Sequence, residues 1–290
     1  MIAPSVVNPG VFYRFEPASN TASVPFLVDV SRSGREYPHD FRSPVPFSTV
    51  HDNISMYVDE LYSTAPALGG TMLYACFPNT YVDTNRSAMD IDESLLDAKW
   101  PGPITKSDFT ERGLGLIKRL SRYGEPMQER KLTVEEVQQR LSEFHEPYHA
   151  ELSRILHDMQ KKNKYTMQLS AHCMSAIGAP THADPGKARA DFNLGDCHGE
   201  TCNPEAIEMV ASILKDLGHT VSINFPYYGG ELIRRHHQRA AGVDSVFIEL
   251  NKALFIDTKT FKRTKDFSAT KRSIDSLLEK ITAYVKENNA

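Results

Sequence analysis

The stretch Val24-Pro25-Phe26-Leu27-Val28-Asp29-Val30 is a short apolar run, and Ser31-Arg32-Ser33-Gly34 follows it at once. A run of this length bounded by turn-forming residues is typical of a buried strand that ends in a tight turn. Segments with apolar residues at helical spacing separate this run from others like it. The sequence therefore predicts an α/β fold with a mainly parallel sheet flanked by helices. The other expected strands are residues 71–77, 165–171, 220–225 and 243–250.

Capping residues, prolines and glycines indicate where the helices begin and end. Thr133-x-x-Glu136 is a capping box, and it predicts a long amphipathic helix to about residue 162, bent at Pro147. Asn203 before Pro204 predicts a helix that ends at Gly218. Further helices are expected at residues 52–64 (capped by Asp52), 229–240 and 268–288.

The remaining segments are expected to be irregular. Residues 1–22 are rich in Pro, Asn and Ser and predict an extended lead-in, and residues 79–132 look loop-rich. No convincing linker interrupts the chain, so residues 1–290 are predicted to form a single domain.

Composition excludes several classes of protein. The 290 residues carry 33 basic and 37 acidic side chains and a net charge of −4, without the basic stripe typical of nucleic-acid binding. No apolar run approaches the length of about 20 residues that a membrane span needs, and residues 1–17 lack the pattern of a secretory signal. We therefore expect a cytoplasmic protein whose four cysteines are free thiols and whose partner is a small molecule. The sequence does not predict the oligomeric state.

In open parallel sheets, ligands bind outside the carboxyl ends of the strands. Glu249 ends the apolar strand at residues 243–250, and acids are almost never fully buried without a partner. This placement favours a functional role for Glu249 over a structural ion pair. The turns to inspect for chemistry are residues 31–35, 81–86, 172–174, 196–199, 224–230 and 249–251.

Seven segments carry a family resemblance that covers nearly the whole chain. They are residues 26–38, Tyr81-Val82-Asp83-Thr84-Asn85-Arg86, Pro147-Tyr148-His149, His172, residues 191–202, residues 224–234 and Phe247-Ile248-Glu249-Leu250-Asn251. In order and spacing they are similar to the motifs of the N-formylglutamate amidohydrolase family. Each alone is a weak signal, but the set is specific.

The resemblance implies a zinc-carboxypeptidase-like (phosphorylase/hydrolase-like) fold and hydrolysis of the formyl amide of N-formyl-L-glutamate. In that chemistry a metal polarises the carbonyl, a carboxylate acts as general base and a guanidinium clamps the substrate carboxylate. Carried over by position, Glu249 is the general base. Asn85 and Arg86 bind a substrate carboxylate, Arg234 is a second carboxylate contact and His172 is a metal ligand.

The sequence departs from the family pattern at the metal. Of the three ligand positions that the resemblance implies, one is Arg32 and one is Ser55, so only His172 remains. A guanidinium has no lone pair to donate, and Ser170 replaces the acid that would orient His172. Arg32 is either an inert replacement or a cation that stabilises an oxyanion or binds an acidic ligand.

Two replacements for the lost ligands stay open. A shifted helix start would bring His51 or Asp52 inward, and a different site of soft ligands could form from His172, Cys173, Cys197, His198 and Cys202. Three functions follow: an amidohydrolase of N-acyl acidic amino acids with a relocated zinc site, a metal-independent enzyme that uses Glu249 and Arg32, and a non-catalytic homologue that binds a small carboxylate.

Overall fold

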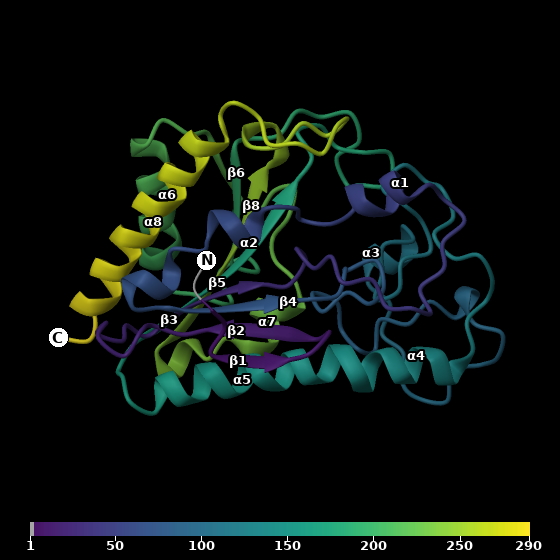
Figure 1. Cartoon of the computed structure of the whole chain (residues 1–290), viewed down its shortest axis with the longest axis horizontal. Coiled ribbons are helices and arrows are strands. Elements are labelled where there is room, and N and C mark those ends of the chain that lie inside the picture. Colours follow the sequence, from purple (N-terminus) through teal and green to yellow (C-terminus); the bar gives the residue numbers. More distant parts are fainter. Residues whose placement is uncertain (1–2) are drawn as a thin grey trace.

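The computed structural model describes residues 3–290, which fold around an eight-stranded mixed sheet (Figure 1). The order of the strands across the sheet is β1-β2-β4-β3-β5-β8-β6-β7. The strands are β1 (Val6–Asn8), β2 (Phe12–Phe15), β3 (Phe26–Val30), β4 (Thr71–Ala75), β5 (Thr166–Met174), β6 (Phe192–Gly195), β7 (Val221–Ile223) and β8 (Val243–Asn251).

The centre of the sheet is parallel, and antiparallel pairs join it to the strands at both margins. β3 pairs in parallel with β4 and with β5, and β5 pairs in parallel with β8. β2 runs antiparallel to β4, and β6 runs antiparallel to β8. The carboxyl ends of the four central strands therefore meet at one edge of the sheet, which is where a ligand is expected. The register of β5 and β8 places His172 beside Glu249 at this edge.

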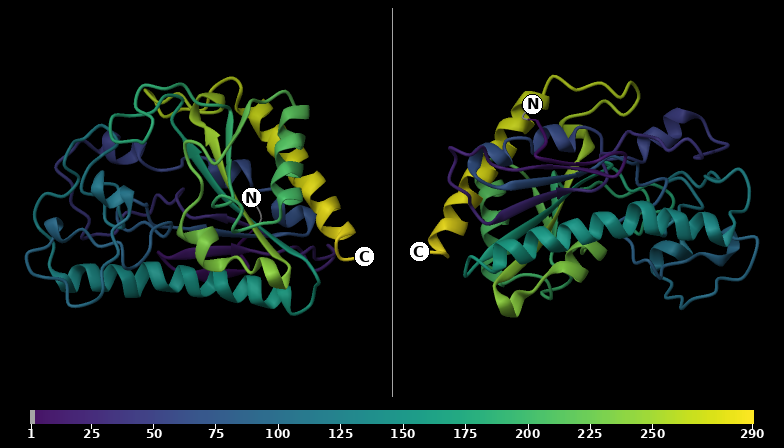
Figure 2. Two further views of the ribbon diagram at one scale, coloured as in Figure 1. Left: turned by 180° about the vertical axis from the view of Figure 1, so that it is seen from behind. Right: turned by 60° about the horizontal axis from the view of Figure 1, so that its bottom comes forward.

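Helices cover both faces of the sheet. In Figures 1 and 2, α5 runs along one face, and α6 and α8 lie together on the other. The helices are α1 (Phe47–Asp52), α2 (Val58–Leu61), α3 (Asp108–Glu111), α4 (Val134–Arg140), α5 (Glu146–Gln160), α6 (Pro204–Asp216), α7 (Glu231–His236) and α8 (Phe267–Glu287). None of the helices described in residues 3–290 is long and apolar enough to span a membrane.

The alternation of side chains along β3 divides the core in two. Phe26 and Val28 pack in the cluster that holds the apolar face of α8, whereas Leu27 packs in the cluster that holds α5. Each fully buried aliphatic or aromatic side chain of this kind contributes about 1.5–3 kcal/mol. The same alternation turns Asp29 toward α5, where Tyr148 and Gln168 donate hydrogen bonds to its carboxylate.

The long helix begins where the sequence predicts, and a π-helical segment interrupts it just before Pro147. The backbone N–H of Glu136 donates to Oγ1 of Thr133, and the backbone N–H of Thr133 donates to the Glu136 carboxylate, so the capping box is complete. A π-helical segment, Leu141–His145, separates α4 from α5 just before Pro147. Proline has no N–H and its ring crowds the preceding turn, and the wider π register accommodates both effects.

Three expectations are wrong in detail. Residues 52–64 do not form one helix: Asp52 ends α1, and Tyr57 adopts a left-handed conformation with φ 65° before α2. The lead-in contains the strands β1 and β2, and residues 191–202, where no strand was predicted, contain β6. These strands are only three or four residues long, so their hydrophobic pattern is too brief to be recognised.

Candidate active site

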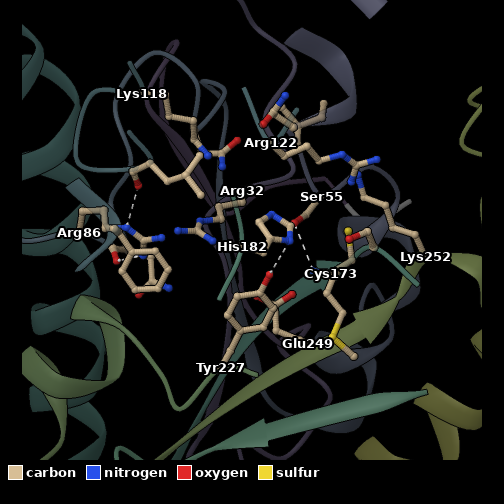
Figure 3. Close-up of a pocket in the computed structure, with 18 of the residues that line it drawn as sticks. Arg32, Ser55, Arg86, Lys118, Arg122, Cys173, His182, Tyr227, Glu249 and Lys252 are labelled. Atoms are coloured by element: carbon tan, nitrogen blue, oxygen red, sulfur yellow. Dashed lines mark hydrogen bonds between the residues drawn. The ribbon is translucent and has the colours of Figure 1, made fainter. Parts of the chain in front are cut away.

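A cavity opens at the carboxyl edge of the sheet (Figure 3). It is walled by the turns after β3, β5 and β8 and by the loops at residues 79–86 and 109–122. Positive charge dominates its lining, because six basic side chains face only two acidic ones. The basic residues are Arg32, Arg86, Arg112, Lys118, Arg122 and Lys252, and the acidic ones are Asp52 and Glu249. The cavity is therefore suited to an anionic ligand.

Arg32 projects into this cavity from the turn after β3. Its Nε and Nη2 donate to Oδ1 and Oδ2 of the buried Asp83 at 3.0 Å and 2.7 Å, a two-point ion pair that fixes the plane of the guanidinium. Burial alone would raise the pKa of Asp83. The positive charges of Arg32, Arg86 and Lys118 outweigh burial and hold that pKa well below its usual range. Asp83 is therefore a permanent anion.

Arg86 has no carboxylate partner among the described residues. Its Nε donates to the carbonyl of Leu114 at 3.2 Å, its Nη1 donates to the carbonyl of Asn85 at 2.8 Å, and its guanidinium lies 3.6 Å from the ring centroid of Phe109. Burial and the nearby charge of Arg32 lower its pKa to about 10. Arg86 is thus held rigidly with its remaining N–H groups available, which suits it to bind the carboxylate of a ligand.

Asn85 joins two of the segments that carry the resemblance. Its Oδ1 accepts the backbone N–H of Leu232 at 3.1 Å. A Cβ at Gly230 would lie 2.3–2.6 Å from the Asn85 amide, so only glycine permits this approach. The contact fixes the loop of Arg86 against the start of α7.

Two buried histidines hold the same loop from the side of α5. Because a carbonyl only accepts hydrogen bonds, Nε2 of His149 donates to the carbonyl of Thr84 at 2.8 Å, and Nε2 of His145 donates to the carbonyl of Arg86 at 2.9 Å. Nδ1 of His149 then accepts a hydrogen bond from Nε2 of His236 at 2.8 Å. Burial lowers the pKa of His145 to about 4, so this layer is neutral at physiological pH.

Glu249 is the acid at the end of β8, and its side chain reaches the cavity. Its Oε2 is buried without a hydrogen-bond partner among the described residues. Burial raises its pKa to about 7, against the opposing influence of the positive charges of Arg32, Arg189 and Arg86. A carboxyl group that gains and loses its proton near pH 7 is suited to general acid–base catalysis.

Lys118 lies on the same side of the cavity as Arg32 and Arg86 (Figure 3). Its Nζ is 3.9 Å from Oδ2 of Asp83 and 3.0 Å from the Asn79 amide oxygen, with that amide turned to satisfy its hydrogen bonds. Burial lowers the pKa of Lys118 to about 7; the negative charge of Asp83 opposes this, and the charges of Arg32 and Arg86 add to it.

A second group of charges lies across the cavity. The Asp52 carboxylate forms an ion pair with Arg122 and accepts a hydrogen bond from the Tyr123 hydroxyl at 3.0 Å. Nζ of Lys252 donates to the Asp52 carbonyl at 2.6 Å and lies 3.6 Å from its Oδ1. Asp52, one of the residues considered as a metal ligand, is instead neutralised by two cations.

The three positions where the resemblance implies metal ligands do lie close together. The backbone N–H of Ser55 donates to the Arg32 carbonyl at 2.8 Å. Oγ of Ser55 accepts the backbone N–H of Cys173 at 3.2 Å, and Cys173 follows His172 in β5. His172 is fully buried and its ring packs against Phe247, with Nε2 2.9 Å from Oγ of Ser170.

These donors do not fit a zinc ion. A catalytic zinc needs three protein ligands, whereas here one position is a cation, one is a serine hydroxyl, and His172 is not among the residues that line the cavity. Within residues 3–290 no three His, Cys, Asp or Glu side chains are arranged to hold a metal. The excess of positive charge in the cavity lining would also oppose the binding of a divalent cation.

The structure does not gather the alternative ligands. His51 contacts the Tyr37 hydroxyl at 3.2 Å and lies outside the cavity lining. Of the soft-ligand group, Cys173 lines the cavity, Cys197 packs with Ile233, and Cys202 is buried in the core beneath α6. His198 stacks on Tyr228 instead, with ring centroids 5.0 Å apart.

Arg234 also lies apart from the residues it was expected to join. It is exposed on α7, with its guanidinium 6.0 Å from the ring centroid of Tyr228, and it does not line the cavity. Its helix turns the side chain away from the sheet edge, whereas its neighbours Leu232 and Ile233 point into the core. The cavity thus unites Glu249, Arg86, Asn85 and Arg32, but not Arg234.

Sequence reasoning missed several side chains of the cavity and of its support. Asp83, which is buried against Arg32, heads the Asp-x-Asn-Arg segment, and Lys252 follows the Glu-x-Asn strand, so the motifs could have indicated both. Lys118 and Arg122 come from the loop-rich region and carry no pattern in the sequence. Tyr227 lies in the resemblance segment at residues 224–234 and lines the cavity beside Glu249 (Figure 3).

The fold and the cavity define an α/β protein with a positively charged cavity that contains a titratable carboxylate. Comparison with known proteins identifies the family. Residues 24–256 match the N-formylglutamate amidohydrolase family, and the chain belongs to this family.

Two relatives agree with that assignment, and one further structure shares the fold. The chain is 26% identical over 236 residues to the N-formylglutamate deformylase of Pseudomonas putida, which is 80% of this chain and 82% of the relative. It is 32% identical to the crystal structure of N-formylglutamate amidohydrolase from Ralstonia eutropha JMP134, with a TM-score of 0.87 and 99% of each chain covered. Gene product Atu2144 from Agrobacterium tumefaciens, at 13% identity and a TM-score of 0.58 over 96% of this chain and 95% of its own, shares the fold.

Proposed function

We propose that this protein hydrolyses the amide bond of an N-formyl, or other N-acyl, acidic amino acid, with N-formyl-L-glutamate as the first candidate substrate. The observation that carries the proposal is the meeting of Glu249 and Arg86 in one buried cavity. The names of the relatives from Pseudomonas putida and Ralstonia eutropha support the same reaction.

We assign to Arg86 the role of binding the substrate carboxylate. The Phe109 ring and two carbonyl groups hold its guanidinium in place, so little side-chain entropy is lost when a carboxylate binds. Paired N–H···O bonds between a guanidinium and a carboxylate are strong and directional. Asn85 accepts the Leu232 N–H with its oxygen, which leaves its Nδ2 to donate to the same ligand.

We assign to Glu249 the role of general base and then general acid in the hydrolysis. As a carboxylate it takes a proton from water, and the hydroxide formed attacks the amide carbonyl. As a carboxylic acid it then returns the proton to the amide nitrogen while the C–N bond breaks. A pKa of about 7 suits both roles, because each protonation state is well populated near neutral pH. The products are the free amino acid and formate, or another carboxylate.

The experiment is a substrate panel. We expect turnover of N-formyl-L-glutamate and N-formyl-L-aspartate, and much weaker turnover of N-formyl-L-leucine, which lacks the second carboxylate. Comparison of N-formyl- with N-acetyl-L-glutamate measures how large an acyl group the site accepts. Binding of these compounds without any hydrolysis would refute the proposal and favour a non-catalytic carboxylate-binding homologue.

A further inference from the structure

Arg32 stands at a position where the resemblance implies a metal ligand. Its backbone carbonyl accepts the N–H of Ser55, and its side chain, like that of Glu249, lines the cavity. In Figure 3 it reaches across the centre of the site, between Arg86 and the side of the cavity where Glu249 lies. A fixed positive charge therefore already stands beside the general base.

Building on the function proposed above, we propose that Arg32 polarises the scissile carbonyl in place of a metal, so that the reaction is metal-independent. The ion pair with Asp83 uses two of the five N–H donors of the guanidinium. The remaining three are free to donate to a ligand oxygen. Preorganised donors aimed at developing negative charge are among the strongest catalytic devices in a dry site.

The reaction balances without any further reactant. Glu249 removes a proton from water as the water oxygen bonds to the carbonyl carbon, and the carbonyl π electrons move onto its oxygen. That oxyanion accepts hydrogen bonds from Arg32. When the carbonyl re-forms, the C–N bond breaks, and the nitrogen takes the proton that Glu249 held. The products are the amine and a carboxylic acid, which ionises.

Asp83 positions the guanidinium of Arg32. Its buried carboxylate compensates the charge of Arg32 and fixes the orientation of the guanidinium fork. One carboxylate faces Arg32, Arg86 and Lys118, so this side of the cavity keeps an excess of positive charge. A carboxylate and an oxyanion of the substrate would both be attracted there, whereas a divalent cation would be repelled.

The first test is the metal content of purified wild-type protein after dialysis against zinc, together with formate release before and after chelation. We expect no retained zinc and unchanged turnover. Stoichiometric zinc in the wild type, or turnover that a chelator abolishes and zinc restores, would overturn the proposal. The matched gain-of-metal variant carries Arg32→His and Ser55→Asp, which with His172 supplies three ligands and should retain about one zinc per chain.

The second test removes the charge. Arg32→Gln should lower kcat by about 10²- to 10³-fold with a smaller change in KM. Arg32→Lys keeps a positive charge beside Asp83 and should recover part of the lost kcat. If the unpaired Asp83 carboxylate unfolds Arg32→Gln, Arg32→Lys replaces it as the test variant. Arg35→Gln is the control, since Arg35 pairs with Asp59 and does not line the cavity.

If no N-acyl substrate is turned over, the proposed function fails. The contact between Arg32 and the ligand can then be tested by binding alone. In calorimetry, N-formyl-L-glutamate should bind more weakly to Arg32→Gln than to Arg35→Gln. Equal affinity of the two variants, or a wild-type kcat unchanged by Arg32→Gln, would overturn the assignment.

Discussion

Replacing Glu249 by glutamine should make the protein more stable and nearly inactive. Glu249 is 3% exposed, and its Oε2 has no hydrogen-bond partner among the described residues, so ionising it costs the folded state free energy. Glutamine has the same shape as the protonated acid but cannot ionise. The substitution therefore removes the cost and leaves the packing unchanged.

The magnitude follows from the pKa of Glu249. It is about 7 in the folded protein and 4.5 when unperturbed, and each pH unit of difference corresponds to about 1.36 kcal/mol, so ionisation destabilises the fold by about 3 kcal/mol. Because the folded pKa is the higher one, the folded state binds the proton more tightly. Stability is therefore lost as pH rises from about 4.5 to about 7, and the loss is constant above that range.

The assay is urea unfolding of the wild type and Glu249→Gln at pH 4.5, 6 and 8. We expect nearly equal free energies of unfolding at pH 4.5, and at pH 8 a variant more stable by about 3 kcal/mol. Glu279→Gln, at an exposed position of α8, is the control and should shift neither value. A variant that is less stable than the wild type at pH 8 would refute the assignment of Glu249 as a buried carboxyl group with a raised pKa.

Three further predictions concern the same cavity. In a pH profile of kcat/KM for N-formyl-L-glutamate, activity should rise with pH through about 7, because the ionised form of Glu249 is the base; an acid limb well below pH 6 would contradict this. Arg86→Lys loses the two-point carboxylate contact, so KM should rise by about 10- to 100-fold with little change in kcat, and an unchanged KM would exclude Arg86 from substrate binding. His149→Phe leaves the Thr84 carbonyl without its hydrogen bond and should destabilise the fold by about 1–3 kcal/mol in urea unfolding. A shift in the pH profile of kcat/KM would contradict this structural role and show that His149 takes part in proton transfer.

The central strands could be predicted because each is buried on both faces. A strand such as β3 or β8 has to be apolar almost throughout, and such a run is visible in the sequence. Two strands toward the margins, β1 and β6, could not be predicted for the opposite reason. β1 has an exposed or half-buried pattern, and β6 contains Asn193 and Gly195, so neither shows an apolar run.

Site residues could be predicted where a charged residue stands out from an apolar strand or belongs to a short motif. Glu249 is an acid on an apolar strand, and Arg86 lies in a short motif after β4, so both were found. Lys118 and Arg122 reach the cavity from a long irregular segment, where position depends on tertiary packing and not on a local period. Arg234 shows the limit of a positional match, because α7 presents it to solvent.

The ion pair of Arg32 with Asp83 could not have been foreseen from composition or spacing. The sequence showed only that a cation replaced an expected ligand at residue 32. Which residue would compensate that charge depends on the approach of two loops 51 residues apart. The structure shows that Asp83, already part of a recognised motif, provides the compensation.

The most direct test of the account is formate release from N-formyl-L-glutamate, measured side by side for metal-free wild-type protein and metal-free Glu249→Gln. The account predicts steady turnover by the wild type and a loss of about 10²- to 10⁴-fold in the variant. No turnover by the wild type, or equal turnover by the two proteins, would contradict it.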